Sequence, residues 1–190
     1  MGNSNTSPLK IVLYIVIFVV CVIAGQAIGR HAPWPVALLG IAAVIAMIVF
    51  FLSGNKKEAK LDSAAAADGL AMQAPADKAR LYIARHGFVA SMQGMNIAID
   101  DTHMGQFKSG RVLFADLEPG RHQVTVQLAK GGKGSVATLD LDLAAGTVTV
   151  LKATVSMGGM NGKCVLEVLP DMASGRGHVA GNKFIAWQQG

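Results

Sequence analysis

Hydrophobic residues fill two long stretches near the start of the chain. Residues 11–29 and 34–52 contain no Asp, Glu, Lys or Arg, and a short polar break that begins at Arg30 separates them. At a rise of about 1.5 Å per residue, each stretch would form a helix of about 26–28 Å, close to the thickness of a bilayer's hydrocarbon core. The pattern therefore predicts a two-helix transmembrane hairpin over residues 11–52, preceded by a polar leader at residues 1–10.

From residue 78 onward, the period of the hydrophobic positions changes to two. Met95, Ile97 and Ile99 alternate with polar or small residues, and the stretches 122–128 and 138–143 alternate in the same way. Strict alternation of this kind is typical of a half-buried β-strand. Further strands are expected at residues 80–85, 105–108, 111–117, 147–155 and 163–169, with glycine-containing turns between them. This spacing predicts an all-β antiparallel sandwich over residues 78–170, of the prealbumin or immunoglobulin type.

Two segments follow neither pattern. Residues 53–77 begin with Ser-Gly-Asn and continue with Lys, Ala, Asp and Glu, which predicts a linker whose alanine-rich part can form a short helix. Residues 171–190 are expected to form a C-terminal segment, with a glycine-rich loop at 174–178 and a final strand or docking segment at 184–187.

The basic residues that flank the apolar stretches predict how the hairpin is oriented. Lysines gather on the side of the two ends, whereas the connecting break carries Arg30. The positive-inside rule then places the soluble domain of this multi-pass membrane protein in the cytoplasm, with an extracytoplasmic (periplasmic) domain as the alternative. An uncleaved first helix is favoured over a cleaved signal peptide because a second apolar stretch follows. The residues expected to anchor the chain at the lipid head groups are Lys10, Tyr14, Trp34, Lys56, Lys57 and Lys60.

Small residues recur at four-residue spacing in both apolar stretches. Gly25 and Gly29 form one such pair, and Ala42 and Ala46 form another. This spacing lets two helices pack closely, either within the hairpin or between two copies of the chain.

The net charge of the chain limits the classes of partner that are expected. The formal net charge is +5 and the sequence pI is about 9.4, with the basic residues spread along the chain. Beside a membrane, this excess favours attraction to anionic lipid head groups. Nucleic acid is not expected as a partner, because the aromatic residues are scattered and form no stacking platform. The two cysteines, Cys21 and Cys164, are not expected to form a disulfide.

Residues capable of catalysis or metal binding show no recognisable spacing. His86, His103, His122 and His178 lack the spacing of metal ligands, and Cys164 shares the parity of neighbouring apolar positions, which predicts a buried structural thiol. Asp140 and Asp142 share a strand face, but a cation requires more oxygen ligands than two. The sequence therefore predicts no catalytic residue, no metal site and no cofactor.

A series of turn residues from Ile97 to Val126 resembles a known pattern. A hydrophobic strand leads to a turn, a Phe114-centred strand follows, and Glu118-Pro-Gly-Arg-His opens the next strand. The motif residues are Asp100, Gly105, Gly110, Pro119, Gly120 and His122. Over about residues 79–170, this order resembles a bacterial membrane-anchored β-sandwich family of unknown function, related to the PEGA domain and prealbumin-like in fold. Asp101 stands where that family usually has glycine. The resemblance implies a surface or envelope-associated module and carries no catalytic residues with it.

Two functional hypotheses follow. The first is a non-enzymatic module that presents a β-sandwich at a membrane surface to a protein partner or to a second copy of the chain. The alternative is a small anion- or metabolite-binding domain, or an enzyme, that uses His86, His103 or His178 together with loop lysines.

Overall fold

The computed structural model divides the chain into two compact units, Met1–Phe50 and Phe51–Gly190. It describes residues 52–158 and 161–188, together with the single positions 25, 35, 38, 41, 42, 45, 46, 49 and 50. All the elements named below lie in the second unit.

The prediction of a transmembrane hairpin as part of the fold is wrong. Within the described residues, no helix combines the length and the apolar character needed to cross a membrane. The two α-helices of the second unit are α3, Ser63–Ala71, and α4, Met172–Val179, with nine and eight residues. Helices of this length extend about 12–14 Å, less than half of the hydrocarbon thickness of a bilayer. Most of residues 11–52, including Tyr14, Gly29 and Trp34, lie outside the described residues, as does the leader with Lys10.

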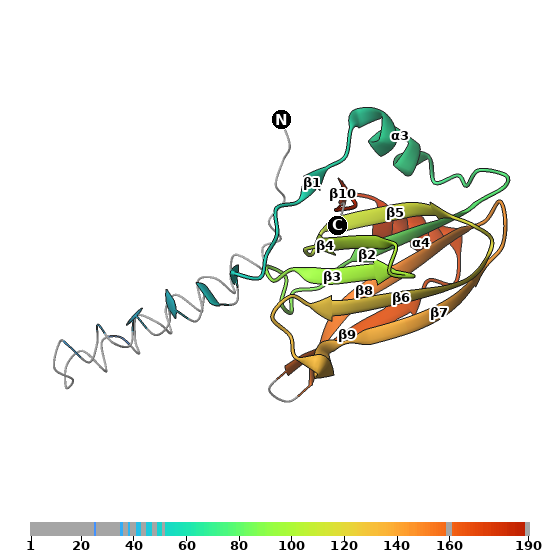
Figure 1. Ribbon diagram of the computed structural model, residues 1–190. Helices are drawn as coiled ribbons and strands as arrows, with labels where there is room; N and C mark the ends of the chain where they lie inside the picture. Colours follow the sequence, from blue (N-terminus) through green and yellow to red (C-terminus); the bar gives the residue numbers. More distant parts are fainter. Residues whose placement is uncertain are drawn as a thin grey trace. The chain divides into compact units, whose positions relative to one another are not determined.

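The β-rich fold is confirmed, and its strands form two sheets (Figure 1). The four-stranded sheet has the order β4-β3-β6-β7, and the six-stranded sheet has the order β1-β10-β5-β2-β8-β9. Their bounds are β1 Ala59–Lys60, β2 Ala79–Arg85, β3 Met95–Ile99, β4 His103–Phe107, β5 Arg111–Leu117, β6 Gly120–Leu128, β7 Ala137–Leu143, β8 Val148–Gly158, β9 Asn161–Val168 and β10 Lys183–Ala186. A short 3-10 helix, Lys133–Ser135, precedes β7.

The pairing is not antiparallel throughout. Strand β2 lies antiparallel to β5 on one side and parallel to β8 on the other, and β10 lies parallel to β5. The chain leaves the six-stranded sheet after β2 and again after β5, and each time it builds part of the four-stranded sheet before it returns. Alternation along a strand identifies its buried face but not the direction of its neighbours, so the sequence could not distinguish these parallel pairs.

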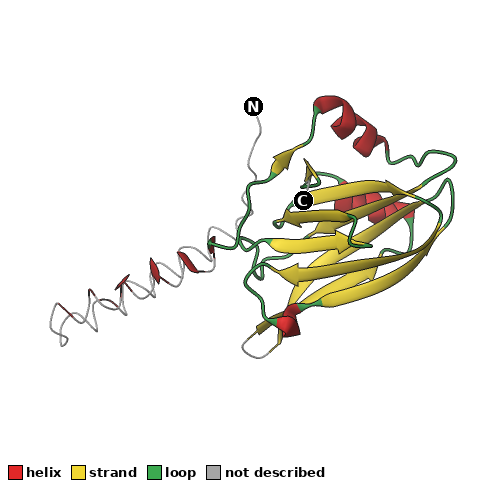
Figure 2. Cartoon of the chain, in the orientation of Figure 1, coloured by secondary structure: helices red, strands yellow, loops and turns green. Residues whose placement is uncertain are grey.

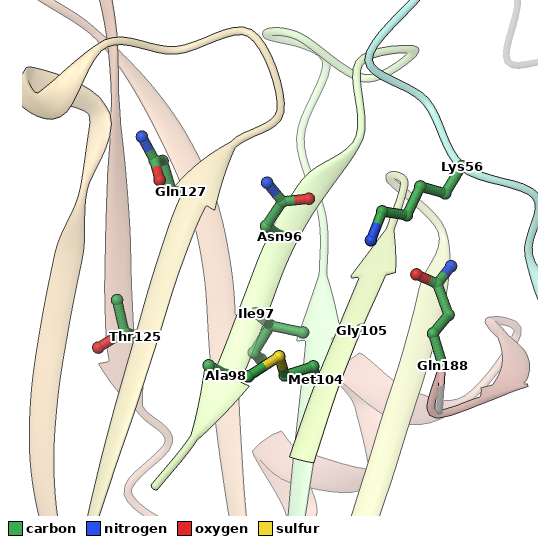
Figure 3. Close-up of a pocket in the computed structure, with 9 residues that line it drawn as sticks. All are labelled: Lys56, Asn96, Ile97, Ala98, Met104, Gly105, Thr125, Gln127 and Gln188. Carbon is green, nitrogen blue, oxygen red and sulfur yellow. The ribbon is translucent and has the colours of Figure 1, made fainter. Parts of the chain in front are cut away.

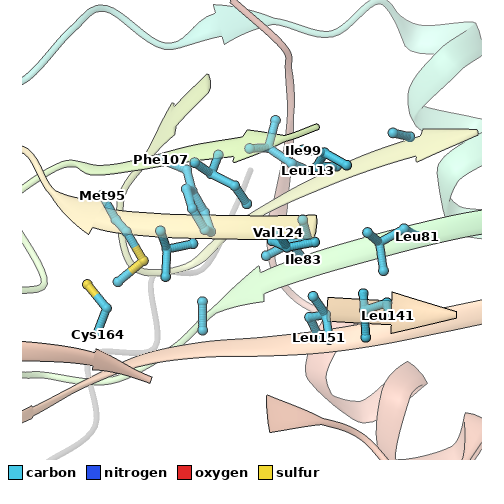
Figure 4. Close-up of a cluster of buried hydrophobic side chains, with 14 of the residues drawn as sticks. Leu81, Ile83, Met95, Ile99, Phe107, Leu113, Val124, Leu141, Leu151 and Cys164 are labelled. Atoms are coloured by element: carbon cyan, nitrogen blue, oxygen red, sulfur yellow. The ribbon is translucent and has the colours of Figure 1, made fainter. Parts of the chain in front are cut away.

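The main core lies between the two sheets, because each sheet turns one apolar face inward (Figure 4). Met95, Ile97 and Ile99 of β3 meet side chains such as Leu81 and Ile83 of β2 in this layer. As predicted from its alternation, β3 therefore turns one face to the core and the other face outward.

A second apolar layer covers the outer face of the six-stranded sheet. Tyr82, Val112, Val150 and Phe184 are buried in this layer together with Val179 of α4. Figure 2 shows the helices in red beside the yellow strands, and α4 contacts β8 and β2. Strand β2 is consequently buried on both faces along its whole length.

The segment expected to be a linker contains an element docked on the sheet. Asp62 caps the N-terminus of α3 by accepting a hydrogen bond from the backbone N–H of Ala65 at 2.7 Å. A Cβ atom on Gly69 would lie 2.9 Å from ring atoms of both Phe114 and Phe184. Glycine therefore lets the helix backbone approach the aromatic side chains of the sheet closely.

An ion-pair cluster also holds α3 on the six-stranded sheet. The guanidinium of Arg80 pairs with Asp116 at 2.6 Å and with Asp68 of α3 at 2.8 Å, and its centre lies 5.2 Å from the centroid of the Phe114 ring. The bond to Asp116 is the largest of the effects that raise the pKa of Arg80. Because Arg80 is buried, these partners compensate the cost of placing a charge beneath the helix.

The glycine-rich residues 174–178, expected to form a loop, lie within α4. Asp171 caps this helix through a 2.7 Å bond from the backbone N–H of Ser174. A Cβ atom on Gly175 would lie 2.8 Å from the side chain of Val150. The close approach to β8 explains why glycine occurs in a helix whose propensity it lowers.

Candidate functional site

A hydrogen-bonded network attaches the segment after Leu52 to the edge of the four-stranded sheet. The buried side chain of Gln106 on β4 donates to the carbonyl oxygen of Gly54 at 2.9 Å and to Oδ1 of Asn96 at 2.8 Å. Its oxygen accepts the backbone N–H of Lys56 at 2.6 Å. Both the nitrogen and the oxygen of the Gln106 amide are thus hydrogen-bonded, and the bond to Lys56 fixes the position of the Lys56 backbone.

Beside this network, the outer face of the four-stranded sheet carries a groove of about 340 Å³ (Figure 3). Its lining residues come from β3, β4 and β6, from the segment before β1 and from the segment after β10. They are Lys56, Asn96, Ile97, Ala98, Met104, Gly105, Thr125, Gln127 and Gln188. Figure 3 shows Lys56 and Gln188 on one side of the groove and Thr125 and Gln127 on the other.

Among the described residues that line the groove, Gln188 carries a buried polar atom with unmet hydrogen-bonding capacity. Nε2 of Gln188 donates to the carbonyl oxygen of Lys57 at 3.0 Å, which fixes the orientation of the amide. Oε1 of the same residue is buried and accepts no hydrogen bond within the described part of the chain. A buried acceptor without a donor costs free energy, so this oxygen is a point at which a ligand would be stabilised.

Sequence reasoning missed this groove. Gly105 was expected to mark a turn, but it lies inside β4, where a Cβ atom would come 3.3 Å from the ring of Trp187. The other lining residues are far apart in the chain, and only the sheet brings residue 56 next to residue 188. The alternation of β3 and β6 does indicate which residues face outward, and this was the available signal.

The turn motif brings Asp100 and His122 together. Nδ1 of His122 donates to Oδ2 of Asp100 at 2.5 Å, and Nε2 donates to the carbonyl oxygen of Glu118 at 2.7 Å. Because a carboxylate and a carbonyl can only accept, both ring nitrogens carry protons in this arrangement. Burial lowers the pKa of His122, but the bonds to Asp100 and to the Glu118 carbonyl outweigh it and raise the pKa above its ordinary value.

The same contact fixes the charge of the carboxylate. The backbone N–H of Gln123 donates to Oδ1 of Asp100 at 2.7 Å, and this bond, followed by the bond from His122, lowers the pKa of Asp100. Asp100 and Asp101 both have positive φ, 48° and 55°, so the β3–β4 turn forms there. Aspartate tolerates this conformation better than most residues, which explains a turn without glycine.

Of the remaining motif residues, Gly105 lies inside β4, whereas Gly110, Pro119 and Gly120 lie at turns. Gly110 has a φ of 79° between β4 and β5, and Gly120 has a φ of 133° at the first residue of β6, directly after Pro119. Three of the motif residues therefore lie where His122 links the turn at Asp100 to the turn at Pro119 and Gly120, at one end of the sandwich.

The structure brings together two of the three histidines considered for catalysis. The rings of His86 and His178 lie 5.1 Å apart, and Nε2 of His86 is within hydrogen-bond distance of the His178 carbonyl oxygen at 2.7 Å and of the Asn182 amide nitrogen at 2.7 Å. His103 packs instead against Trp187, with ring centroids 5.4 Å apart. These contacts attach α4 and the segment after it to the end of β2.

No metal centre is found in the part of the chain that the structure describes. None of its His, Cys, Asp and Glu side chains gather in groups of three or more that could hold an ion. Asp140 shares a hollow of about 530 Å³ with Asp100, His122 and Arg121, and it accepts a hydrogen bond from Gln123 at 3.0 Å.

A buried arginine organises the loop between β2 and β3. The guanidinium of Arg85 donates to the carbonyl oxygens of Gln93, Ala90 and Phe107 at 2.6, 2.7 and 2.9 Å, and Arg85 is 1% exposed. Burial lowers the pKa of Arg85 to about 10. The nearby thiol of Cys164 is also buried, as expected, and burial raises its pKa.

The same loop exposes large apolar side chains. Phe88 is 57% exposed and Met92 is 68% exposed. Together with Leu52, they border a shallow cavity of about 270 Å³. We call Leu52, Phe88 and Met92 the apolar loop patch.

The residues predicted to anchor the chain or to pack helices are placed as follows. Lys56, Lys57 and Lys60 are exposed. Gly25, Ala42 and Ala46 are helical and exposed, and no atom would lie within 4 Å of a Cβ added at Gly25.

Strands β2 to β8 and most of β9 fall within a region that matches a protein-family model. Residues 75–165 match the family described as protein of unknown function (DUF2846). The matched region thus contains the four-stranded sheet and the turn motif, whereas Lys56 and Gln188 of the groove lie outside it. No curated protein matches the chain.

Proposed function

We propose that this chain is a non-enzymatic interaction module that works at a membrane surface and binds a protein partner there. The observation that carries the membrane part is the apolar loop patch. Phe88 and Met92 are mostly exposed, and they lie beside Leu52, the last residue of the uncharged apolar sequence. A gathered group of exposed apolar side chains is typical of a surface that another apolar body covers.

The patch is held in a fixed conformation, which supports a binding role. Three carbonyl acceptors surround Arg85, and two of them, Ala90 and Gln93, belong to the loop. From the other side, Asn55 donates to the carbonyl oxygen of Met92 at 3.0 Å and accepts from the backbone N–H of Gly94 at 2.6 Å. The exposure of Phe88 and Met92 is therefore built into the loop.

Lysines next to the patch favour lipid as the apolar body. Lys56 and Lys57 follow Leu52 in the chain and are exposed. Apolar side chains that enter the head-group region, together with nearby cations that attract anionic lipids, are the combination that binds proteins to membrane surfaces. Full burial of one such apolar side chain contributes about 1.5–3 kcal/mol.

The non-enzymatic part rests on the internal use of the reactive groups. His122 links two turns, His86 and His178 join α4 to β2, and Arg80 holds α3. Each of these groups is engaged by other parts of the domain, as expected of structural cross-links.

The experiment places a fluorophore on the patch. The full chain, with Cys21→Ser, carries Met92→Cys labelled with an environment-sensitive dye and is reconstituted into vesicles of phosphatidylcholine and phosphatidylglycerol. We expect a blue-shifted emission that a lipid-phase quencher reduces. The control is Met157→Cys, because Met157 is 81% exposed and lies in β8, outside the loop. Equal access of an aqueous quencher to both positions would contradict the proposal.

The cytoplasmic placement and the relationship to the PEGA domain stay predictions.

A further inference from the structure

We propose that the groove on the outer face of the four-stranded sheet binds an extended peptide through an acidic side chain. The choice of an acidic ligand rests on the charge of the groove. Among the described residues that line the groove, Lys56 is the one charged residue, and none of them is acidic. No ion pair or hydrogen bond of the Lys56 ammonium is found among the described residues, whereas the neighbouring Glu58 is paired with Arg111 at 3.0 Å.

The polar groups around Lys56 suit a peptide backbone. Asn96 uses Oδ1 to accept from Gln106, which leaves Nδ2 as a donor. Gln127 uses Nε2 to donate to the carbonyl oxygen of Gly131 at 3.2 Å, which leaves Oε1 as an acceptor. A peptide offers both an acceptor and a donor at each amide, so it matches a groove that presents both.

The unsatisfied oxygen of Gln188 is the second, independent observation. Its amide nitrogen is held by Lys57, so the oxygen cannot exchange places with it without losing that bond. A backbone N–H of the bound peptide would donate to this buried acceptor. Figure 3 shows Gln188 and Lys56 on the same side, so one peptide segment can meet both.

The floor of the groove is apolar and low. Ala98 and Gly105 have little or no side chain, and Met104 adds a flexible thioether that is 48% exposed. The volume of about 340 Å³ lies at the lower end of the range for ligand sites. A few residues of peptide fit such a space, with the acidic side chain directed at Lys56.

Lys56 belongs both to this groove and to the lysines proposed to attract lipid, so the two proposals need separate tests. The groove and the apolar loop patch share no residue, so the peptide test is carried out in detergent without lipid vesicles.

The test is a titration of the full chain in detergent micelles, followed by the backbone amide resonances. The probes are the blocked peptides acetyl-Gly-Glu-Gly-amide and acetyl-Gly-Gln-Gly-amide. We expect the glutamate peptide to shift the resonances of Asn96, Ala98 and Gly105 saturably and to bind about three- to fivefold more tightly than the glutamine peptide. Absence of saturable shifts at these residues would overturn the proposal.

Two variants separate charge from shape. Lys56→Gln is expected to remove the preference for the glutamate peptide, while Lys163→Gln, an equal change of charge on β9, preserves it. Ala98→Phe fills the floor from the solvent side and is expected to weaken both peptides at least tenfold. An undiminished preference in Lys56→Gln, or unchanged binding in Ala98→Phe, would show that the peptide binds elsewhere.

Discussion

His122 and Asp100 form an ion pair, 2.5 Å between Nδ1 and Oδ2, that joins parts of the chain separated by strands β4 and β5. The side chain of His122 is 11% exposed, whereas that of Asp100 is 35% exposed. Solvent therefore screens the carboxylate side of the pair, and we expect it to contribute about 1 kcal/mol to the free energy of unfolding.

The ion pair between His122 and Asp100 predicts that the free energy of unfolding falls on both the basic and the acidic side of a pH range. The pKa of His122 is raised above 6.5, so its stabilisation is complete below pH 6.5 and is lost as the pH rises through the folded-state value. The pKa of Asp100 is lowered below 3.8, so its stabilisation is complete above pH 3.8 and is lost as the pH falls through the folded-state value. We expect the difference in unfolding free energy between the wild type and His122→Gln to be largest between these limits.

Denaturant unfolding at a series of pH values measures this difference. A difference that stays constant from pH 5 to about pH 9 would contradict the double protonation of the ring. Thr138→Ser is a suitable control because Thr138 is exposed, lies on the same sheet and carries no titratable group itself.

The Gly69→Ala variant tests the docking of α3. The added Cβ atom would lie 2.9 Å from ring atoms of Phe114 and Phe184, so the helix must move away from the sheet. We expect a loss of about 1–3 kcal/mol in the free energy of unfolding. The matched control is Gly177→Ala in α4, where nothing lies within 4 Å and the higher helix propensity of alanine predicts a small gain. Equal effects of the two variants would show that α3 is not packed on the aromatic side chains.

Arg85→Met tests the organisation of the loop that carries Phe88. Methionine fills much of the arginine's space, but the carbonyl groups of Ala90, Gln93 and Phe107 lose their donors. We expect a loss of about 2–4 kcal/mol in the free energy of unfolding, since buried acceptors are left unpaired. Hydrogen exchange of the amides from residue 88 to 94 is expected to accelerate more than that of β6.

The exposed Arg176 supplies the control for that change, as Arg176→Met. Exchange in the loop that matches the wild type, in an Arg85→Met protein that remains folded, would show that the loop holds its conformation without the guanidinium.

Cys164 predicts a chemical readout of folding. The thiol is 1% exposed and burial raises its pKa, so both access and ionisation oppose its reaction. In a Cys21→Ser background, we expect maleimide to modify Cys164 only as fast as the domain opens. The adjacent position serves as a reference: Lys163→Cys, with Cys164→Ser, is exposed on the same strand and is expected to react rapidly. Comparable rates for the two thiols in native protein would contradict the burial of Cys164.

The central strands could be predicted from the sequence because they obey a local rule. Met95, Ile97 and Ile99 alternate and are buried in the structure, and the buried thiol of Cys164 follows from the same parity. The parallel pairing of β2 with β8 has no local pattern, since neighbours far apart in sequence determine it. The apolar stretch over residues 11–52 shows the opposite limit, because hydrophobicity alone led to a membrane-spanning fold that the described helices do not form.

The groove could not be predicted because it depends on close approaches and distant partners. Gly105 indicates a turn by composition, yet it lies in a strand beside Trp187, and Gly175 indicates a loop, yet it lies in a helix beside Val150. In both cases, glycine is explained by a neighbouring side chain that no sequence pattern reveals. Lys56 and Gln188 come together only because β1 pairs with β10.

That last pairing has a practical consequence for anyone who trims the protein. Strand β10 covers one side of β5, and β1 in turn covers β10. A fragment cut to residues 75–165 would lose both strands and both helices, leaving β5 with a bare hydrogen-bonding edge and Tyr82 and Val112 open to water. Such an edge recruits other chains, so the excised fragment is expected to aggregate where the intact domain stays dispersed.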